Sequence, residues 1–220
     1  MRMRKKKWAD PYMESHADLI YKNPCALKGK WRALLGCMCL HVEIGMGKGD
    51  YLNAMAAMYP REGWVGIERD HSAAAVAVRK AIEADSADFH NKRMICGKAE
   101  DLCQWFDQGE VHVIHLNFSD PWPKTYTHKR RLSSKRFLEM YRVLLDDEGM
   151  IRMKTDNQGL FSDSVLYFQQ NGFILTEFSL NYRVAMHEED AVTEYERRFM
   201  DLGQPIYQLC AVKRKMDMVQ

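Results

Sequence analysis

Short apolar runs alternate along this chain with longer stretches in which apolar side chains recur every three or four residues. Continuous apolar runs are typical of strands buried on both faces, and the wider spacing is typical of helices that bury one face. The strands are predicted at 38–44, 63–68, 92–96, 111–117, 150–154, 173–179 and 206–212. The helices are predicted at 51–58, 72–84, 99–106, 133–144 and 160–170.

This alternation predicts an α/β fold with a doubly wound, mostly parallel seven-stranded sheet, because near-continuously apolar strands need helices on both faces. Ser133 is expected to cap the helix over 133–144, and Asn171-Gly172 to end the helix over 160–170. The length suits one domain over residues 1–220, beginning with a basic segment over residues 1–30. Ligands of such sheets bind at the carboxyl ends of the strands, so the residues at those ends are the candidates for a site.

Composition narrows the class of protein. Hydrophobic residues make up 46% and charged residues 28%, which is typical of a globular protein in water. No apolar stretch approaches the ~20 residues of a membrane span, and the N-terminus lacks the apolar run of a secretory signal. We therefore expect a cytoplasmic protein that makes no contact with a membrane.

The six cysteines match neither a disulfide framework nor a zinc site in their spacing. We expect reduced cysteines in the core and no bound metal, because free cysteine is usually a small buried hydrophobe.

The net charge of +2 does not by itself indicate a nucleic acid partner, but basic residues are concentrated locally. They gather at Arg2–Lys7, Lys124–Arg136 and Lys213–Lys215. The two terminal clusters are typical of solvated tails. The middle cluster carries more information because it follows a candidate site motif directly.

A glycine-rich loop follows the first predicted strand. Gly45, Gly47 and Gly49 permit positive φ angles and let backbone amides approach a ligand closely. A dinucleotide fingerprint requires glycine or alanine where this chain has Asp50. Glu43 stands before the loop, and a carboxylate there suits a ligand with a cationic amino group. S-adenosylmethionine carries both an ammonium and a sulfonium, so it is the expected cofactor.

The second and third predicted strands end in further polar residues. Glu68 lies roughly 20 residues after the glycine loop, where a carboxylate accepts both ribose hydroxyls of an adenosine. Lys98-Ala99-Glu100 follows the third strand, where the adenine would rest. Either the side chain or the backbone of these residues can make the contact. The alternative is that they only begin a helix and do not contact the cofactor.

The fourth predicted strand ends in an unusual segment over residues 117–124. Pro121 and Pro123 bracket Trp122 and fix the backbone in an extended turn. Such a turn can present Asp120 and an aromatic ring to a base. The alternative is a rigid structural turn with a packed tryptophan.

Several motifs occur together along the chain. They are Glu43-x-Gly-x-Gly-x-Gly49, Asn117-Phe-Ser-Asp-Pro-Trp-Pro-Lys124, His128-Lys-Arg-Arg-Leu132, Lys154-Thr-Asp156 and Thr193-Glu-Tyr-Glu196 with Phe199. Together they resemble the bacterial tRNA (guanine-N7-)-methyltransferases, which form 7-methylguanosine in the variable loop of tRNA. The resemblance covers nearly the whole chain, and it implies a Rossmann-like class I methyltransferase fold.

The resemblance assigns roles by position. It implies cofactor contacts at Glu43, Gly45, Gly47, Gly49, Glu68, Lys98 and Asp120, the last of which it also implies to be catalytic. Ala99 is expected to contact the cofactor because of its place beside Lys98 after the third strand. It implies substrate contacts at Lys124, Asp156, Thr193, Glu194, Tyr195 and Glu196.

The chemistry of guanine fits this site. Guanine N7 bears an in-plane lone pair and no proton, so a direct displacement needs no general base. Aligning N7 with the methyl group supplies roughly 7–11 kcal/mol at best. Asp120, Asp156 and Glu196 are expected to accept hydrogen bonds from guanine and to favour the cation that forms.

The middle basic cluster is expected to meet the tRNA backbone. Lys129, Arg130 and Arg131, with Lys135 and Arg136, are predicted to contact phosphates. A homodimer remains possible.

Three other functions stay open. Asp-Pro-Trp loosely resembles the Asp-Pro-Pro-Tyr turn of enzymes that methylate exocyclic amines of adenine or cytosine. A nicotinamide-dependent dehydrogenase would use the same sheet, and a non-catalytic RNA-binding module could retain the fold.

Overall fold

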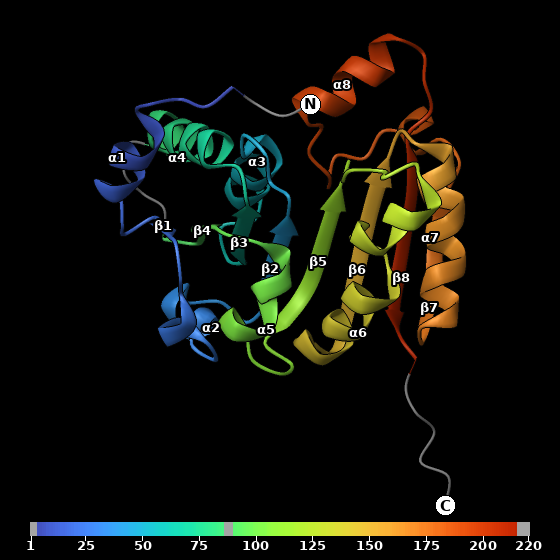
Figure 1. Cartoon of the computed structure of the whole chain (residues 1–220), viewed down its shortest axis with the longest axis horizontal. Helices are drawn as coiled ribbons and strands as arrows, with labels where there is room; N and C mark the ends of the chain where they lie inside the picture. Colours follow the sequence, from blue (N-terminus) through green and yellow to red (C-terminus); the bar gives the residue numbers. More distant parts are fainter. Residues whose placement is uncertain (1–3, 86–89, 215–220) are drawn as a thin grey trace, which may run out of the picture.

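Eight strands form one sheet in the computed structural model, which describes residues 4–85 and 90–214 (Figure 1). The strand order is β1-β4-β3-β2-β5-β6-β8-β7, and β8 alone runs antiparallel to its neighbours. The strands are β1 Ile20–Tyr21, β2 Leu40–Ile44, β3 Gly63–Glu68, β4 Lys92–Cys96, β5 Val111–Asn117, β6 Leu145–Thr155, β7 Phe173–Ser179 and β8 Tyr207–Lys213.

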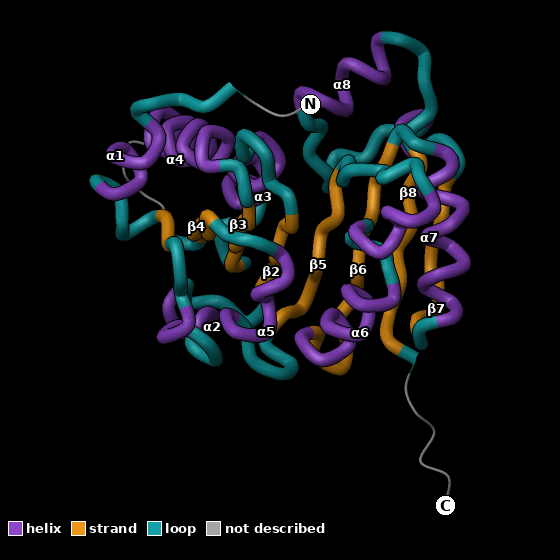
Figure 2. The backbone as a smooth tube through the Cα atoms, viewed as in Figure 1, coloured by secondary structure: helices purple, strands orange, loops and turns teal. Residues whose placement is uncertain are grey.

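Helices cover both faces of this sheet, as Figure 2 shows along the backbone. They are α1 Ala9–Glu14, α2 Trp31–Leu34, α3 Asp50–Met58, α4 His71–Asp85, α5 Leu102–Trp105, α6 Lys135–Leu144, α7 Gln158–Gln170 and α8 Glu194–Asp201. Short 3-10 segments lie at Cys25–Leu27, Ala99–Asp101, Thr125–Arg130 and Tyr182–Val184. Two buried apolar clusters result, one between the sheet and α1, α3 and α4, the other between the sheet and α2, α5, α6 and α7.

The predicted α/β, doubly wound, mostly parallel sheet is confirmed, with two differences in its strands. β1 is an additional strand that pairs with β4, and two residues are too few to give a periodic signal. β6 begins at Leu145 rather than at residue 150, because Leu145 pairs with Val111 across an irregularity in the register.

One predicted helix cap is wrong and one helix end is confirmed. α6 begins after Ser134, and Ser133 is instead buried with its Oγ 2.7 Å from Ser164 Oγ. Ser133 therefore joins α6 to α7 instead of capping a helix. α7 ends at Gln170 with Asn171 as its C-cap, and Gly172 has a φ of +80°, the left-handed conformation that favours glycine.

All six cysteines are free thiols, as expected, but they are not all in the core. Cys37, Cys96 and Cys210 are buried, Cys39 and Cys103 are partly buried, and Cys25 is exposed. Within residues 4–85 and 90–214, no helix is both long and apolar enough to cross a bilayer. Parts of the two terminal basic clusters, at residues 1–3 and 215, lie outside the described residues.

Strand order reverses at β2. β2 pairs in parallel with β3 on one side and with β5 on the other, so the chain moves outward to β4 and then returns to the middle of the sheet. Loops that leave β2 and β5 in opposite directions open a crevice at their carboxyl ends. The segments after β2, β3 and β5 therefore meet at one edge of the sheet.

Gly49, which precedes α3, has two reasons to be glycine. Its φ is +76°, and a Cβ there would lie 2.7 Å from Ala77 Cβ on α4. Gly203 offers a matched control, since its φ is +66° but a Cβ there meets no atom within 4 Å.

We expect Gly49→Ala to lower the free energy of unfolding more than Gly203→Ala. Both variants carry the left-handed penalty of about 1–2 kcal/mol, and Gly49→Ala adds an overpacking cost of about 1–3 kcal/mol. Urea denaturation of both variants measures the difference. Equal losses would contradict the close contact between α3 and α4.

Candidate active site

The glycine loop is a tight turn from β2 into α3. Gly45, Gly47 and Gly49 all have positive φ angles, and Gly45 N and Met46 N both donate to Ile67 O at 2.8 and 3.0 Å. A Cβ placed at Gly45 or Gly47 would meet no atom within 4 Å. The loop therefore offers an open surface that a ligand can approach closely.

Glu68 ties this loop to the end of β3. Its Oε2 accepts from Gly47 N at 3.0 Å and its Oε1 accepts from Asp70 N at 2.8 Å. Each carboxylate oxygen has a second lone pair, so the side chain can still accept hydrogen bonds from a ligand. Gly97 N donates to Glu68 O, which places Lys98 and Ala99 beside the same strand end.

Glu43 is buried beneath this loop with one oxygen unpartnered. Its side chain is 2% exposed, and its Oε1 accepts from Asn117 Nδ2 at 3.1 Å. Its Oε2 has no hydrogen-bond partner among the described residues. Burial raises the pKa of Glu43 to about 7, against the opposing effects of Asn117 and Lys154.

The turn after β5 is strained and firmly held. Phe118 (φ +49°) and Trp122 (φ +41°) are the non-glycine residues with positive φ in the described chain. Such conformations persist where the surroundings impose them. Phe118 N donates to Lys154 O at 2.8 Å, Arg131 Nε donates to Pro121 O at 2.7 Å, and the Arg130 guanidinium lies 5.0 Å from the Trp122 ring.

The predicted phosphate contact of Arg131 is wrong. Arg131 is 3% exposed and forms an ion pair with Asp163 at 2.5 Å while it holds the turn. The Arg131 guanidinium is therefore buried and bonded within the protein, where a phosphate of an RNA cannot reach it. Lys129, Arg130, Lys135 and Arg136 are exposed.

Asp120 reaches across the glycine loop from the turn after β5. It is exposed, and its Oδ2 lies 3.3 Å from Arg69 Nη2. Arg69 directly follows Glu68 at the end of β3, on the other side of β2. The carboxylates of Glu68 and Asp120 thus border the same crevice, and Arg69 is a neighbour that sequence reasoning missed.

The segment from Thr193 to Glu196 divides into buried and exposed residues. Thr193 Oγ1 accepts from Glu196 N at 2.9 Å and Glu196 Oε2 accepts from Thr193 N at 3.3 Å, which is a capping box at the start of α8. Glu196 is fully buried and ion-paired with Lys154 and Arg183. The predicted hydrogen bond from a base to Glu196 is therefore wrong.

The exposed residues of that segment lie over the turn after β5. The Tyr195 ring lies 5.2 Å from the Phe118 ring, and Glu194 forms an ion pair with Lys48 of the glycine loop at 3.4 Å. Burial raises the pKa of the Tyr195 hydroxyl, and the nearby charges of Asp156 and Asp120 raise it further. These contacts therefore attach the start of α8 to the turn after β5 through Tyr195 and to the glycine loop through Glu194.

Comparison with known proteins decides the family. A family model described as "Putative methyltransferase" matches residues 38–209. A tRNA (guanine-N(7)-)-methyltransferase from Limosilactobacillus reuteri (strain DSM 20016) is 42% identical over 213 residues, covering 96% of this chain and 99% of that protein. The enzyme of the same name from Bacillus subtilis (strain 168) is 40% identical over 208 residues, covering 94% and 96%. This chain belongs to the tRNA (guanine-N(7)-)-methyltransferase family.

Solved structures confirm the class I methyltransferase fold of this family member. The 16S rRNA methyltransferase KamB superposes with a TM-score of 0.63 at 13% identity, covering 84% of this chain and 92% of that one. A SAM dependent methyltransferase from Aquifex aeolicus gives a TM-score of 0.56 at 11% identity, covering 80% and 82%. At such identities the likeness shows the fold alone.

The residues present in this methyltransferase fit S-adenosylmethionine. The unpartnered Oε2 of Glu43 favours a cationic ligand, and the open faces of Gly45 and Gly47 allow close approach of a flat or extended one. Glu68 would hold the ribose through the lone pairs that its bonds to Gly47 N and Asp70 N leave free. Within the described residues, no cluster of side chains has the composition of a metal site.

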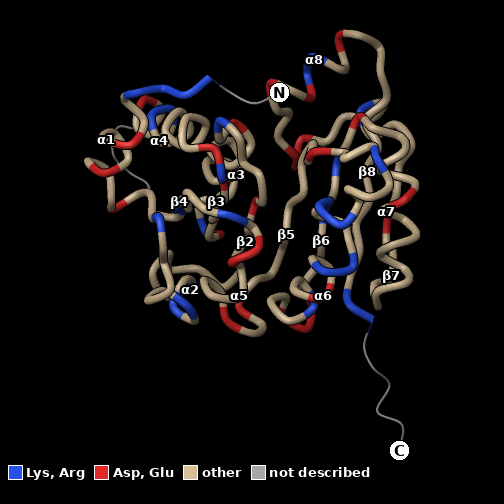
Figure 3. Tube along the Cα trace, viewed as in Figure 1, with Lys and Arg blue, Asp and Glu red and all other residues tan. Residues whose placement is uncertain are grey.

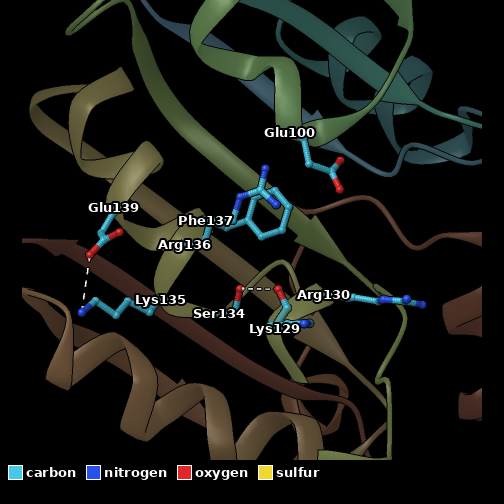
Figure 4. Close-up of a pocket in the computed structure, with 8 residues that line it drawn as sticks. All are labelled: Glu100, Lys129, Arg130, Ser134, Lys135, Arg136, Phe137 and Glu139. Atoms are coloured by element: carbon cyan, nitrogen blue, oxygen red, sulfur yellow. Dashed lines mark hydrogen bonds and ion pairs between the residues drawn. The ribbon is translucent and has the colours of Figure 1, made fainter. Parts of the chain in front are cut away.

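A basic groove lies beside the strained turn (Figure 4). Its volume is about 550 Å³, and Figure 3 shows basic positions gathered in front of β6 in the same region. The groove is lined by Glu100, Lys129, Arg130, Ser134, Lys135, Arg136, Phe137 and Glu139. Four of these side chains are cationic, so the groove suits an anionic polymer.

The buried Glu43 predicts a pH dependence of stability in the cofactor-free protein. The ordinary pKa is 4.5 and the folded pKa is about 7, so between these values the folded protein holds a proton that the unfolded chain releases. The stabilisation from this group is present at low pH and is lost as the pH rises toward 7, by about 1.4 kcal/mol for each pH unit.

Glu43→Gln should remove that part of the slope. Urea denaturation of both proteins at several values between about pH 5 and about pH 7 measures it. The difference in unfolding free energy between wild type and Glu43→Gln should change steadily across this range. A constant difference would show that Glu43 is ionised throughout.

Proposed function

We propose that this protein transfers a methyl group from S-adenosylmethionine to N7 of a guanine in the variable loop of tRNA, forming 7-methylguanosine. The observation that supports this most is that three segments meet at one open glycine loop. Glu68 accepts from Gly47 N, Asp120 pairs with Arg69 beside Glu68, and Glu194 at the start of α8 pairs with Lys48 of the loop. Membership of the tRNA (guanine-N(7)-)-methyltransferase family supplies the substrate class.

In this proposal the residues at the carboxyl ends of β2, β3 and β4 would hold the cofactor. Glu68 accepts the ribose hydroxyls, Lys98 and Ala99 border the adenine, and the glycine loop approaches the methionine part. Glu43 contributes negative charge beneath the cationic end. S-adenosylmethionine would supply a methyl group bound to a sulfonium sulfur. When the methyl group passes to N7, the sulfur would leave as a neutral thioether.

The target guanine enters over the turn after β5. Asp120 and Asp156 accept hydrogen bonds from guanine N1–H and its exocyclic amine, which selects guanine over adenine. Tyr195 and Phe118 provide aromatic surface on which a turned-out base can stack. Burial raises the pKa of Asp156, and the positive charge that forms on the methylated ring favours its ionised form.

No proton has to leave N7 before attack, so the reaction needs alignment and charge stabilisation rather than a general base. Asp120 is an exposed carboxylate in the turn after β5, beside the crevice, and we assign it the catalytic role. Its pairing with Arg69 is exposed, and such pairs are worth little, so a base can displace it. Lys124 and Glu194 border the same entrance as substrate contacts, whereas Thr193 is buried and its hydroxyl caps α8.

The tRNA backbone follows the basic groove. Lys129 and Arg130 contact phosphates next to the target nucleotide, and Lys135 and Arg136 extend the contact along α6. The protein works in the cytoplasm as a single domain over residues 1–220. Whether two copies associate does not change this assignment.

The product nucleoside tests the proposal directly. The purified protein should convert guanosine in an unmodified tRNA transcript to 7-methylguanosine when supplied with labelled S-adenosylmethionine. Asp120→Asn should slow single-turnover transfer by roughly 10²–10³ without loss of the fold. Methylated adenosine or cytidine would instead support a methyltransferase for exocyclic amines, and full activity of Asp120→Asn would remove Asp120 from catalysis.

The basic groove predicts a strong salt dependence of tRNA binding. Replacing Lys129 and Arg130 together by alanine should flatten the slope of log affinity against log salt by roughly one unit for each lost phosphate contact. Arg61 is a matched control, because it is exposed before β3 at the opposite edge of the sheet. Filter binding at several salt concentrations measures the slopes. An equal change for Arg61→Ala would contradict a localised tRNA site.

A further inference from the structure

Four charged side chains are buried together where β6 ends. Lys154 Nζ lies 2.6 Å from Asp190 Oδ2 and 3.1 Å from Glu196 Oε2. Arg183 lies 2.5 Å from Asp190 Oδ2 and 2.6 Å from Glu196 Oε1. Each side chain is at most 5% exposed, so the group is a neutral quartet of two cations and two anions.

This ion quartet, formed by Lys154, Arg183, Asp190 and Glu196, is joined to the cofactor side of the site by Tyr51. The Tyr51 hydroxyl donates to Asp190 Oδ1 at 2.8 Å and lies 3.2 Å from His115 Nδ1. Tyr51 stands in the first turn of α3, immediately after the glycine loop. Lys154 Nζ also lies 4.8 Å from the centre of the Tyr51 ring.

Other contacts attach the same segment to α3. Tyr59 OH donates to Glu189 O at 2.9 Å, and Ala191 N lies 3.4 Å from Met55 Sδ. The chain between the 3-10 segment Tyr182–Val184 and α8 is thereby held against α3, the helix that follows the glycine loop. Figure 1 shows α8 raised above the carboxyl edge of the sheet, where these contacts hold its beginning.

Burying two ion pairs is a costly way to gain stability, because apolar side chains of similar volume often serve as well. Buried ion pairs do impose one geometry, since each charge must meet its partner. Here Glu196 belongs to the quartet and is also the N3 residue of the capping box at the start of α8. The quartet therefore sets the direction in which Glu194 and Tyr195 leave the start of α8.

We propose that Tyr51 and Asp190 are positioning residues for methyl transfer: they lock the substrate segment Thr193–Glu196 to α3, and so to the cofactor loop. This inference rests on the proposed function. Tyr195 and Glu194 would then contact the base from a fixed position relative to the cofactor loop. Loss of the Tyr51–Asp190 hydrogen bond loosens the segment over the base without removing any contact to the cofactor.

Tyr51→Phe tests this, because it removes one hydroxyl and keeps the ring. We expect single-turnover methylation of tRNA to slow roughly tenfold, the factor that corresponds to one lost hydrogen bond, or the KM for tRNA to rise by a similar factor. The Kd for S-adenosylmethionine, measured by calorimetry, should stay within about twofold of wild type. Tyr141→Phe is the matched control: the Tyr141 hydroxyl is buried on α6 with no hydrogen-bond partner among the described residues.

A second variant separates positioning from folding. Arg183→Gln with Asp190→Asn removes one cation and one anion, so the remaining Lys154 and Glu196 still form a neutral pair. It should still bind S-adenosylmethionine and should methylate tRNA more slowly than Tyr51→Phe. Wild-type methylation rate and tRNA KM in both variants would overturn the proposal. So would an equal loss of cofactor affinity and tRNA activity, because the hydrogen bond would then support the whole site.

The failure of the proposed function is a different result. It would be seen in the wild-type reaction alone, as the absence of 7-methylguanosine from the product. The comparison of Tyr51→Phe with wild type does not depend on which base atom receives the methyl group.

Discussion

Parallel pairing of β2 with both β3 and β5 determines what this molecule can do. In a parallel sheet all carboxyl ends point the same way, and a reversal of strand order leaves the central loops without a covering helix. β2, β3 and β5 end in the glycine loop, in Glu68 and in the Asp120 turn. The apolar side chains on both faces make this arrangement rigid, and the site is assembled from residues that the strands deliver to one edge.

Electrostatics arranges the site in two layers. Beneath the surface, the ion quartet carries charges that water does not screen, and the buried Glu43 carboxyl has one oxygen without a hydrogen-bond partner among the described residues. At the surface, Asp120 and the cations of the basic groove are exposed, and Asp156 is partly exposed. The buried layer gives fixed geometry, whereas the exposed layer can exchange its partners for those of an RNA.

The sequence indicated the sheet well because buried parallel strands are continuous apolar runs, and it indicated the glycine loop, Glu68 and Asp120 because each lies at a strand end. The sequence-based predictions were wrong where a charged side chain is buried by an ion pair with a residue far away in the sequence. Arg131 is withdrawn from solvent by Asp163, and Glu196 by Lys154 and Arg183. A signal for Glu196 was present, because Thr-x-x-Glu is the pattern of a capping box. β1 was too short to be recognised, and Arg69 stands in a position that no motif marks.

Hydrogen exchange of backbone amides, measured with and without each ligand, tests most directly whether one edge of the sheet holds both substrates. S-adenosylmethionine alone should protect the amides of residues 45–49 and 68–70. Addition of tRNA should extend protection to residues 124–131 and 193–196. Protection by S-adenosylmethionine at the opposite edge of the sheet, or protection by tRNA that spares both of those segments, would contradict the account.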